Sequence, residues 1–238
     1  MQVIDNLVLE VGRKCNMNCP HCLRGAAEDA TLSFEDAKKA IDEVESIGQI
    51  TFTGGEPFLY SELISKIIDY IMSNKKEVYG FYMATNGSIL DFSLLCKFAE
   101  FYAYIIDIGG EVEYSCEIDI SNDIYHNWIP DKNIDIFKAF RFCNTRGEDM
   151  NEECLINEGR AYENGMGHRE MDDSYIFDYY EECDSTSMVY VNALGDVLPD
   201  CNYSYNTQRI MCPYSIHNFT LSEIVNMANG VTTEELCA

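Results

Sequence analysis

Apolar residues fall into short segments along the first half of the chain, and their spacing changes from one segment to the next. Residues 2–11 are rich in valine, leucine and isoleucine, which predicts a buried strand. Apolar positions then recur with helical spacing between Ser33 and Gly48, where a capping serine and a glycine predict the two ends of a helix. These positions are Ala37, Ala40, Ile41, Val44 and Ile47.

The same alternation continues as far as residue 142. Residues 49–53 and 78–85 are short apolar runs that predict strands, and residues 61–73 and 90–102 have helical spacing. An alternation of strands and helices is typical of an α/β fold with a parallel sheet. Three further runs predict strands, at residues 104–108, 114–120 and 137–142.

Beyond residue 160 the pattern is different. Residues 163–182 are polar and acidic, which predicts a linker or loop. Apolar runs at 189–193 and 196–198 flank Gly195 and predict a β-hairpin, and residues 222–228 predict a short final helix. We therefore divide the chain into a main unit (1–160), a linker (161–187) and a C-terminal segment (188–238).

Composition restricts the partners. The chain has 238 residues, 47% hydrophobic, which suffices for one core and at most a small appendage. It carries 16 basic and 41 acidic residues, a formal net charge of −25. Such a surface repels nucleic acid, so we expect neither DNA nor RNA as a substrate.

The cysteines and the N-terminus bear on the compartment. An odd count of 11 cysteines does not resemble a secreted disulfide framework. The N-terminus lacks the basic and apolar regions of a signal peptide, and no run of about 18 apolar residues could span a membrane. We expect a cytoplasmic protein with no membrane partner.

The chemistry is concentrated in the loop after the first strand. Cys15, Cys19 and Cys22 are spaced so that three thiolates can converge on one metal centre. A closed zinc or iron–sulfur site needs four ligands, so three leave one position open. The alternatives are a zinc site or three unrelated thiols. His21 lies between two of the cysteines, where it is badly placed to be a fourth ligand.

A second motif follows the second predicted strand. Gly54 and Gly55 would let the backbone approach a ligand closely, and Glu56 supplies an acceptor for an ammonium group. Alone, this Gly-Gly-Glu sequence is also typical of an ordinary βα turn. The third predicted strand ends at Thr85 and Asn86, before Gly87, which equally fits a simple Asn-Gly turn.

Together the cysteine spacing and the Gly-Gly-Glu motif resemble the radical S-adenosylmethionine (SAM) superfamily. The resemblance implies a partial (β/α)6 barrel of the TIM type over residues 1–160. It also implies a [4Fe–4S] cluster on the three cysteines, with SAM at the open iron and its amino group beside Gly54, Gly55 and Glu56. The implied activity is reductive cleavage of SAM to a 5′-deoxyadenosyl radical, which then abstracts hydrogen from a substrate.

The resemblance extends more loosely to other candidate SAM-binding residues. Thr85 and Asn86 would lie beside SAM, Ser121 and Asp123 would approach its ribose or the substrate, and Arg160 would pair with a carboxylate. An exposed turn at residues 121–123 and a solvated arginine are the alternatives. His126 is a candidate acid–base group, although its position fits a surface histidine better.

The C-terminal hairpin resembles the start of the auxiliary-cluster modules called SPASM and twitch domains. The chain lacks the later cysteine run of those modules, which indicates a degenerate remnant. A second cluster or a zinc ion at Cys201 and Cys212, with Cys183 and Cys237, is the alternative to a hairpin that has lost its metal. We favour a single cluster, with the hairpin as a lid and substrate platform.

Several functions are compatible with these features. The hairpin favours a peptide or protein substrate, as in peptide maturases, over a small molecule. A glycyl-radical-enzyme activase is the alternative enzyme, and an iron–sulfur electron carrier is the alternative that is not an enzyme. The carrier would have no use for the Gly-Gly-Glu motif. The resemblance to radical SAM enzymes also implies a reducing partner such as flavodoxin or ferredoxin.

Overall fold

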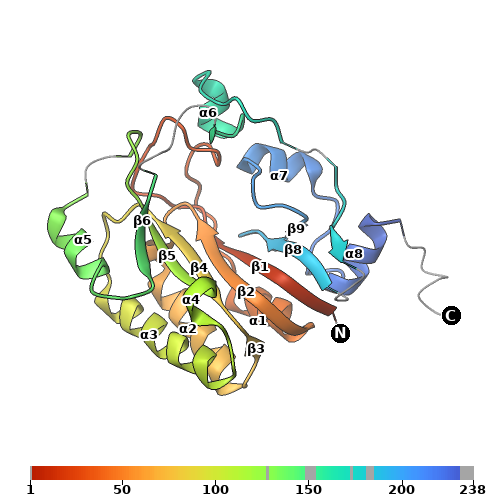
Figure 1. Cartoon of the computed structure of the whole chain (residues 1–238). Coiled ribbons are helices and arrows are strands. Elements are labelled where there is room, and N and C mark those ends of the chain that lie inside the picture. Colours follow the sequence, from red (N-terminus) through yellow and green to blue (C-terminus); the bar gives the residue numbers. More distant parts are fainter. Residues whose placement is uncertain (1, 127–128, 148–153, 172–173, 181–184, 231–238) are drawn as a thin grey trace.

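A computed structural model describes residues 2–126, 129–147, 154–171, 174–180 and 185–230. In this part of the chain, nine strands form a single sheet (Figure 1). The order of neighbouring strands is β6-β5-β4-β2-β1-β8-β7, with β3 beside β2 and β9 beside β8. The strands are β1 (Gln2–Gly12), β2 (Val44–Gly54), β3 (Glu77–Val78), β4 (Phe81–Thr85), β5 (Cys116–Ser121), β6 (Cys143–Arg146), β7 (Tyr179–Tyr180), β8 (Ser185–Val191) and β9 (Val197–Leu198).

The larger helices cover one face of this sheet (Figure 1). Their buried side chains pack against alternate residues of the strands, such as Leu7 and Leu9 of β1, in one continuous apolar core. The helices are α1 (Phe34–Asp42), α2 (Ser61–Ser73), α3 (Phe92–Asp107), α4 (Val112–Ser115), α5 (Asp131–Phe137), α6 (Gly159–Glu163), α7 (Tyr205–Met211) and α8 (Leu221–Ala228), with a 3-10 turn η1 (Pro57–Tyr60).

The predicted α/β class and parallel sheet are confirmed. Strands β1, β2, β4, β5 and β6 are all parallel, as consecutive βα units require. The sheet runs from β6 to β7 without closing into a full barrel, which agrees with a partial barrel. Because the strands are parallel, their carboxyl ends meet at one edge, where the loops that carry the chemistry gather.

The first helix is shorter than predicted. It ends at Asp42, and β2 begins at Val44 and pairs with β1 from its first residue. Val44 and Ile47, which helical spacing assigned to the helix, are therefore buried strand residues. Ser33 caps the helix as predicted, since its hydroxyl accepts a hydrogen bond from the Asp36 amide.

The strand predicted at 114–120 begins later, at Cys116, directly after α4. Three other predicted strands needed larger corrections. Residues 104–107 form the last turn of α3 and Ile108 is its C-cap, because the apolar face of that helix continues through Ile105. The predicted strand 137–142 is absent, because Phe137 is the last residue of α5 and residues 138–142 connect that helix to β6. The predicted strand 78–85 is divided into β3 and β4 around Gly80, where a side chain would lie 2.4 Å from the carbonyl oxygen of Ser115.

The C-terminal hairpin is present and extends the main sheet. Strand β8 pairs antiparallel with β9, with Val191 opposite Val197, and parallel with β1, with Leu7 opposite Val189. Sheet pairing therefore runs across the predicted boundary at residue 187. No helix in the described ranges is long and apolar enough to cross a membrane.

Candidate functional site

The loop that carries the three cysteines (Lys14 to Arg24, the cysteine loop) leaves the carboxyl end of β1. Hydrogen bonds join this end of β1 and the loop to the end of β2. The Gly55 amide donates to the carbonyl of Gly12 (2.9 Å), and the Glu56 amide donates to the carbonyl of Lys14 (2.9 Å). A Cβ atom at Gly54 would lie 2.1 Å from the Gly12 oxygen, and one at Gly55 would lie 2.2 Å from the Lys14 oxygen. The absence of Cβ atoms at these two glycines therefore allows the cysteine loop to lie against the end of β2. The sequence had instead suggested that the glycines make room for a ligand.

The three cysteines are half-buried and line one cavity of about 320 Å³. Burial raises the pKa of Cys15 and raises that of Cys19 to about 11, so these thiols hold their protons when no metal is bound. A cationic metal centre would offset this cost by stabilising the thiolates. Three free thiols on one short loop, facing one cavity, fit a three-cysteine cluster.

Glu56 lies in the same cavity wall and is almost completely buried, with 1% of its surface exposed. Its Oε1 accepts hydrogen bonds from the hydroxyl of Thr85 (2.7 Å) and the amide of Phe58 (3.1 Å), and its Oε2 accepts one from the amide of Asn86 (2.9 Å). Burial nevertheless raises the pKa of this carboxyl above its ordinary value. A fixed, buried carboxylate of this kind gains from a cationic ligand.

Thr85 and Asn86 therefore hold Glu56 as well as lining the cavity themselves. The side-chain amide of Asn86 also donates to Oδ1 of Asn16 in the cysteine loop (2.9 Å). The end of β4 is thus tied to both motifs. The structure brings together the two motifs and the Thr-Asn sequence that lie far apart in the chain.

Ser121, the last residue of β5, and Asp123, two residues later, line the same cavity. Oδ1 of Asp123 accepts bonds from the amides of Tyr125 (2.9 Å) and His126 (3.1 Å), and its Oδ2 lies 2.8 Å from Nδ1 of His126. Burial opposes ionisation of Asp123, but the hydrogen bonds from His126 and Tyr125 outweigh it, and the pKa is lowered. Asp123 is therefore an ionised group that orients His126.

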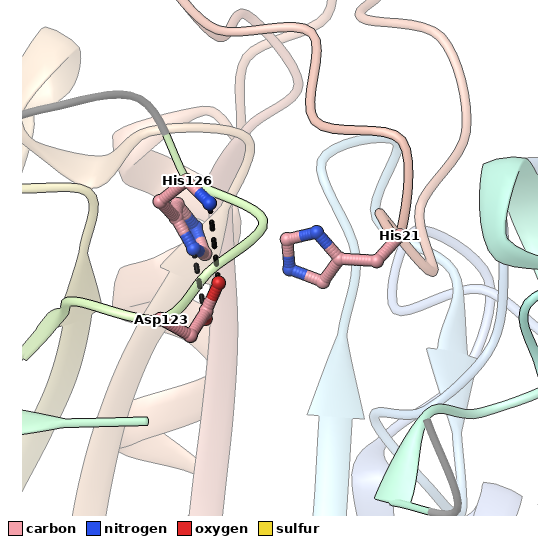
Figure 2. A group of neighbouring side chains, drawn as sticks. All are labelled: His21, Asp123 and His126. Atoms are coloured by element: carbon pink, nitrogen blue, oxygen red, sulfur yellow. Dashed lines mark hydrogen bonds and ion pairs between the residues drawn. The ribbon is translucent and has the colours of Figure 1, made fainter. Parts of the chain in front are cut away.

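Figure 2 shows His21 of the cysteine loop facing this pair. The ring centroids of His21 and His126 are 4.9 Å apart in an edge-to-face arrangement. Ligand atoms of His21, Asp123 and His126 all lie within 4.8 Å of one another, so the three could also hold a cation. Burial lowers the pKa of His21, so its ring is neutral near neutral pH. His126, predicted as a surface histidine, is a cavity residue.

Arg160 lines the cavity from α6 and holds the cysteine loop. Its Nε donates to the carbonyl of Cys19 (2.9 Å), its Nη1 donates to Oδ1 of Asn18, and its amide donates to the carbonyl of Cys22 (2.9 Å). Gly159, at a positive φ of 53°, lies against the same loop, where a Cβ would be 2.3 Å from the Leu23 oxygen. Gly159 and Arg160 therefore hold the cysteine loop in place.

Arg146, at the end of β6, is a cavity residue that sequence reasoning missed. Its Nη1 donates to the hydroxyl of Tyr82 (2.6 Å), which in turn donates to Oδ2 of Asp119 (2.9 Å). The only available signal was its place at the end of a strand, and that strand was itself predicted wrongly. With Arg24, Arg146 and Arg160, the cavity lining is rich in arginine although the whole chain is strongly acidic.

The C-terminal segment packs on the cysteine loop through a buried polar network. Arg13, which is fully buried, donates to Glu10 (2.5 Å), Glu28 (2.9 Å) and Gln208 of α7 (2.5 Å). The hydroxyl of Tyr190 in β8 donates a hydrogen bond to Oε2 of Glu10. Elements from the two ends of the chain therefore fix the loop that carries the cysteines.

Cys201 and Cys212 belong to the same C-terminal packing. Both contact a small apolar cluster that contains Tyr190 and Tyr203. The thiol of Cys212 donates to the carbonyls of Tyr214 (3.0 Å) and Val197 (3.2 Å). Cys183 and Cys237, the other two predicted ligands of a second metal, lie outside the described residues.

Comparison with protein families gives a match in the first part of the chain. The model of the radical SAM superfamily matches residues 9–149, which is more than half of the chain. Curated relatives include the uncharacterized protein MJ0907 of Methanocaldococcus jannaschii, 34% identical over 101 residues (41% of this chain and 35% of the relative). The GTP 3′,8-cyclase of Campylobacter lari is 34% identical over 98 residues (37% and 29%). The chain spans about a third of the length of these relatives.

Solved structures with the same fold cover almost the whole chain. The protein anSMEcpe, solved with bound AdoMet and a Cp18Cys peptide, has a TM-score of 0.56 and 14% identity and covers 98% of this chain and 85% of its own. Streptococcus suis SuiB, bound to the precursor peptide SuiA, has a TM-score of 0.53 and 12% identity, with coverages of 98% and 67%. At these identities the similarity shows a shared fold.

Proposed function

Because the chain belongs to the radical SAM superfamily, we propose that its arginine-rich cavity binds SAM beside a [4Fe–4S] cluster held by Cys15, Cys19 and Cys22, and that the enzyme modifies a peptide or protein. Enzymes of this superfamily use that cluster, SAM and a reductant. When bound, the cluster supplies the electron that cleaves SAM to methionine and a 5′-deoxyadenosyl radical, which removes a hydrogen atom from the substrate.

The observation that carries this proposal is the convergence of all the predicted residues on one cavity. These residues come from five separate segments of the chain, and each lines the same space: the three cysteines, Gly54 to Glu56, Thr85 and Asn86, Ser121 and Asp123, and Arg160. Its size lies at the lower end of the range of small-molecule sites, roughly 300–1,000 Å³.

The residues around the cavity can be given separate tasks. Glu56 would accept hydrogen bonds from the ammonium group of SAM, since it is a buried carboxylate that lines the cavity beside the cysteines. Arg160 would place a positive charge beside the cysteines for a carboxylate. Ser121 and Asp123 would offer acceptors and a hydroxyl donor to the ribose or the substrate.

The peptide or protein substrate is supported by a weaker observation. Two proteins of the same fold, anSMEcpe and SuiB, have been solved with bound peptides. This chain has the C-terminal hairpin packed against β1, and its acidic surface would attract a basic peptide. A flavodoxin or ferredoxin would deliver the electron.

Anaerobic reconstitution with iron and sulfide, followed by addition of dithionite and SAM, tests the activity. We expect 5′-deoxyadenosine to form with the wild-type protein and to be absent when Cys15, Cys19 and Cys22 are all replaced by Ala. Cys96→Ala, on the far helix α3, is the matched control and should behave as wild type. A wild-type protein that holds a cluster and binds SAM but releases no 5′-deoxyadenosine would contradict the proposal.

A further inference from the structure

Two histidine rings in the cavity have buried nitrogen atoms with no hydrogen-bond partner among the described residues. These atoms are Nδ1 of His21, in the cysteine loop, and Nδ1 of His126, after β5. A buried nitrogen that stays unpaired has lost its hydrogen bonds to water without replacing them. Two such atoms on rings that face one another (Figure 2) indicate that a shared partner is missing.

Asp123 adds a carboxylate to the two rings. Its side chain is 2% exposed, and that of His126 is 14% exposed. Oδ2 of Asp123 lies 2.8 Å from Nδ1 of His126, although this nitrogen makes no hydrogen bond there. Without a proton between them, an oxygen and a nitrogen lone pair at this distance repel one another, and a cation bound to both atoms would remove the repulsion.

The three residues are close enough to share one ion. One ligand atom from each of His21, Asp123 and His126 lies within 4.8 Å of the other two. Two ligands held about 2.0–2.1 Å from one ion lie at most about 4.2 Å apart. Side-chain rotations that move these atoms by less than about 1 Å would therefore complete the coordination.

Backbone hydrogen bonds fix the loop that carries Asp123 and His126. The amide of Asn122 donates to the carbonyl of Arg146 in β6 (2.9 Å). Oδ1 of Asp123 accepts hydrogen bonds from the amides of Tyr125 and His126, which leaves Oδ2 for an ion. The carboxylate therefore needs little rearrangement to bind a cation.

We propose that His21, Asp123 and His126 bind one divalent transition-metal ion of the Zn²⁺ type, separate from the cluster. Two imidazoles and one carboxylate suit such an ion, whereas Mg²⁺ and Ca²⁺ prefer oxygen ligands. Three protein ligands leave at least one coordination position open. Because all three residues line the cavity, the ion would lie in the space where SAM and the substrate bind.

The role of the open position rests on the proposed function. An ion at this site would hold a thiolate or carboxylate of the substrate beside SAM, because both groups are ligands that Zn²⁺ accepts. Asp123 would then reach the substrate through the ion, and Ser121 would remain for the ribose. The binding of the ion itself does not depend on SAM or on the cluster.

Titration with Co²⁺, a spectroscopic substitute for Zn²⁺, tests the inference. The full chain with Cys15, Cys19 and Cys22 replaced by Ala holds neither the cluster nor a thiolate in the cysteine loop. Calorimetry should show one Co²⁺ bound per chain, and the visible spectrum should show d–d bands without a thiolate charge-transfer band in the near ultraviolet. Excess Mg²⁺ should not displace the Co²⁺. A thiolate band, or displacement by Mg²⁺ as from an acidic surface, would overturn the inference.

Two substitutions in the same background locate the ion. His126→Ala and Asp123→Asn should each weaken Co²⁺ binding by at least about 100-fold, since the loss of an outer-sphere partner alone costs about 10–100-fold. His217→Ala is the matched control, because Nε2 of His217 lies 3.1 Å from Asp36 in a histidine–aspartate pair with no third ligand among the described residues. Equal affinity in the three variants would overturn the inference.

The reconstituted wild-type protein provides a second measurement that does not depend on the folding of the triple variant. After excess metal has been removed, elemental analysis should find one Co²⁺ beside about four irons per chain. His126→Ala should lose the Co²⁺ and keep the irons, whereas Cys201→Ser should keep both. Loss of iron in step with uptake of Co²⁺ would show that cobalt replaces the cluster, and would overturn the inference.

The two proposals fail in different ways. A wild-type protein that cleaves SAM but binds Co²⁺ no more tightly than His126→Ala would refute only the ion site. A wild-type protein that holds a cluster and never cleaves SAM, with tight Co²⁺ binding that His126→Ala abolishes, would refute the proposed function and leave the ion site in place.

Discussion

Glu56 is the residue on which SAM binding should depend most. It is buried, held by three hydrogen bonds, and directly connected to the cysteine loop through its own amide. None of these contacts uses a cysteine sulfur. Its loss should therefore separate SAM binding from assembly of the cluster.

We expect Glu56→Ala to weaken SAM binding roughly tenfold to a hundredfold, because a charge-assisted hydrogen bond is worth about 1.5–3 kcal/mol. The iron content and the visible spectrum of the cluster should not change. Calorimetric titration of SAM into the anaerobic protein measures the effect, with Glu62→Ala on the exposed side of α2 as the control. Equal SAM affinity in the two variants would exclude Glu56 from the SAM site.

The raised pKa of Glu56 predicts a pH dependence. Only the ionised carboxylate attracts an ammonium group, and burial makes this carboxyl take up a proton at a higher pH than an ordinary glutamate does. SAM affinity should therefore fall on acidification, beginning above the usual glutamate pKa of about 4.3. Calorimetry between about pH 8 and pH 5 should show this decline in the wild type and a flatter profile in Glu56→Ala.

At the scale of elements, the ends of β1 and β2 are joined so closely that no side chain fits between them. The Cβ of an alanine at Gly55 would lie 2.2 Å from a backbone oxygen, which cannot move aside as a flexible side chain could. We expect Gly55→Ala to lower the free energy of unfolding by about 1–3 kcal/mol, the usual cost of overpacking, and to impair cluster retention.

Gly109→Ala separates this effect from the general cost of replacing a glycine. Gly109 has a φ of 91° and nothing within 4 Å of an added Cβ, so its replacement should cost only the left-handed backbone penalty, about 1–2 kcal/mol. Urea unfolding and iron analysis of both variants provide the comparison. Retention of a full cluster in Gly55→Ala would show that the loop tolerates displacement.

In the elements that were predicted correctly from the sequence, the apolar residues recur with a single spacing, helical or strand-like, along the whole element. The α2 helix and the β1 strand are of this kind. The errors occurred where a run of apolar residues fits both the spacing of a helix and that of a buried strand. Val44 continues a helical stripe, yet its neighbours also make a buried strand, and only pairing with β1 decides between them. Tyr104 and Ile105 are typical strand residues that complete the apolar face of α3.

The convergence of the candidate residues on one cavity follows from the sequence more directly than the limits of the elements that carry them. Motif residues at strand ends converge whatever the exact strand limits are, because parallel strands end at one edge. Arg146 and His21 were missed as cavity residues because their neighbours are distant in sequence. No local pattern indicates that His21 faces His126, or that Arg13 meets Gln208.

For the whole molecule, the Arg13 network should be a main source of stability. Removing one partner of a buried ion pair leaves the other charge uncompensated and typically costs about 3–5 kcal/mol. We expect this loss for Arg13→Ala in urea unfolding of the cluster-free protein. Arg209 lies on the same helix as Gln208, and Arg209→Ala, which breaks the more exposed pair with Glu28, should cost about 1 kcal/mol or less.

The number of metal sites is also a property of the whole molecule. We expect Cys201→Ser to leave about four irons per chain and unchanged SAM cleavage, since Cys201 packs in an apolar cluster. Iron and zinc analysis of the anaerobically purified protein measures this. About eight irons, or four irons and one zinc, in the wild type would instead favour a second site.

The bond between Arg13 and Gln208 joins residues 195 positions apart. At a synthesis rate of about 5–20 residues per second, a ribosome needs roughly 10–40 s after making Arg13 before Gln208 exists. During that interval the three cysteines have already been synthesised, but α7, which bonds to Arg13 beside their loop, has not. Iron insertion before that point would therefore meet a loop that α7 does not yet hold, and delivery of the cluster should follow the synthesis and docking of α7.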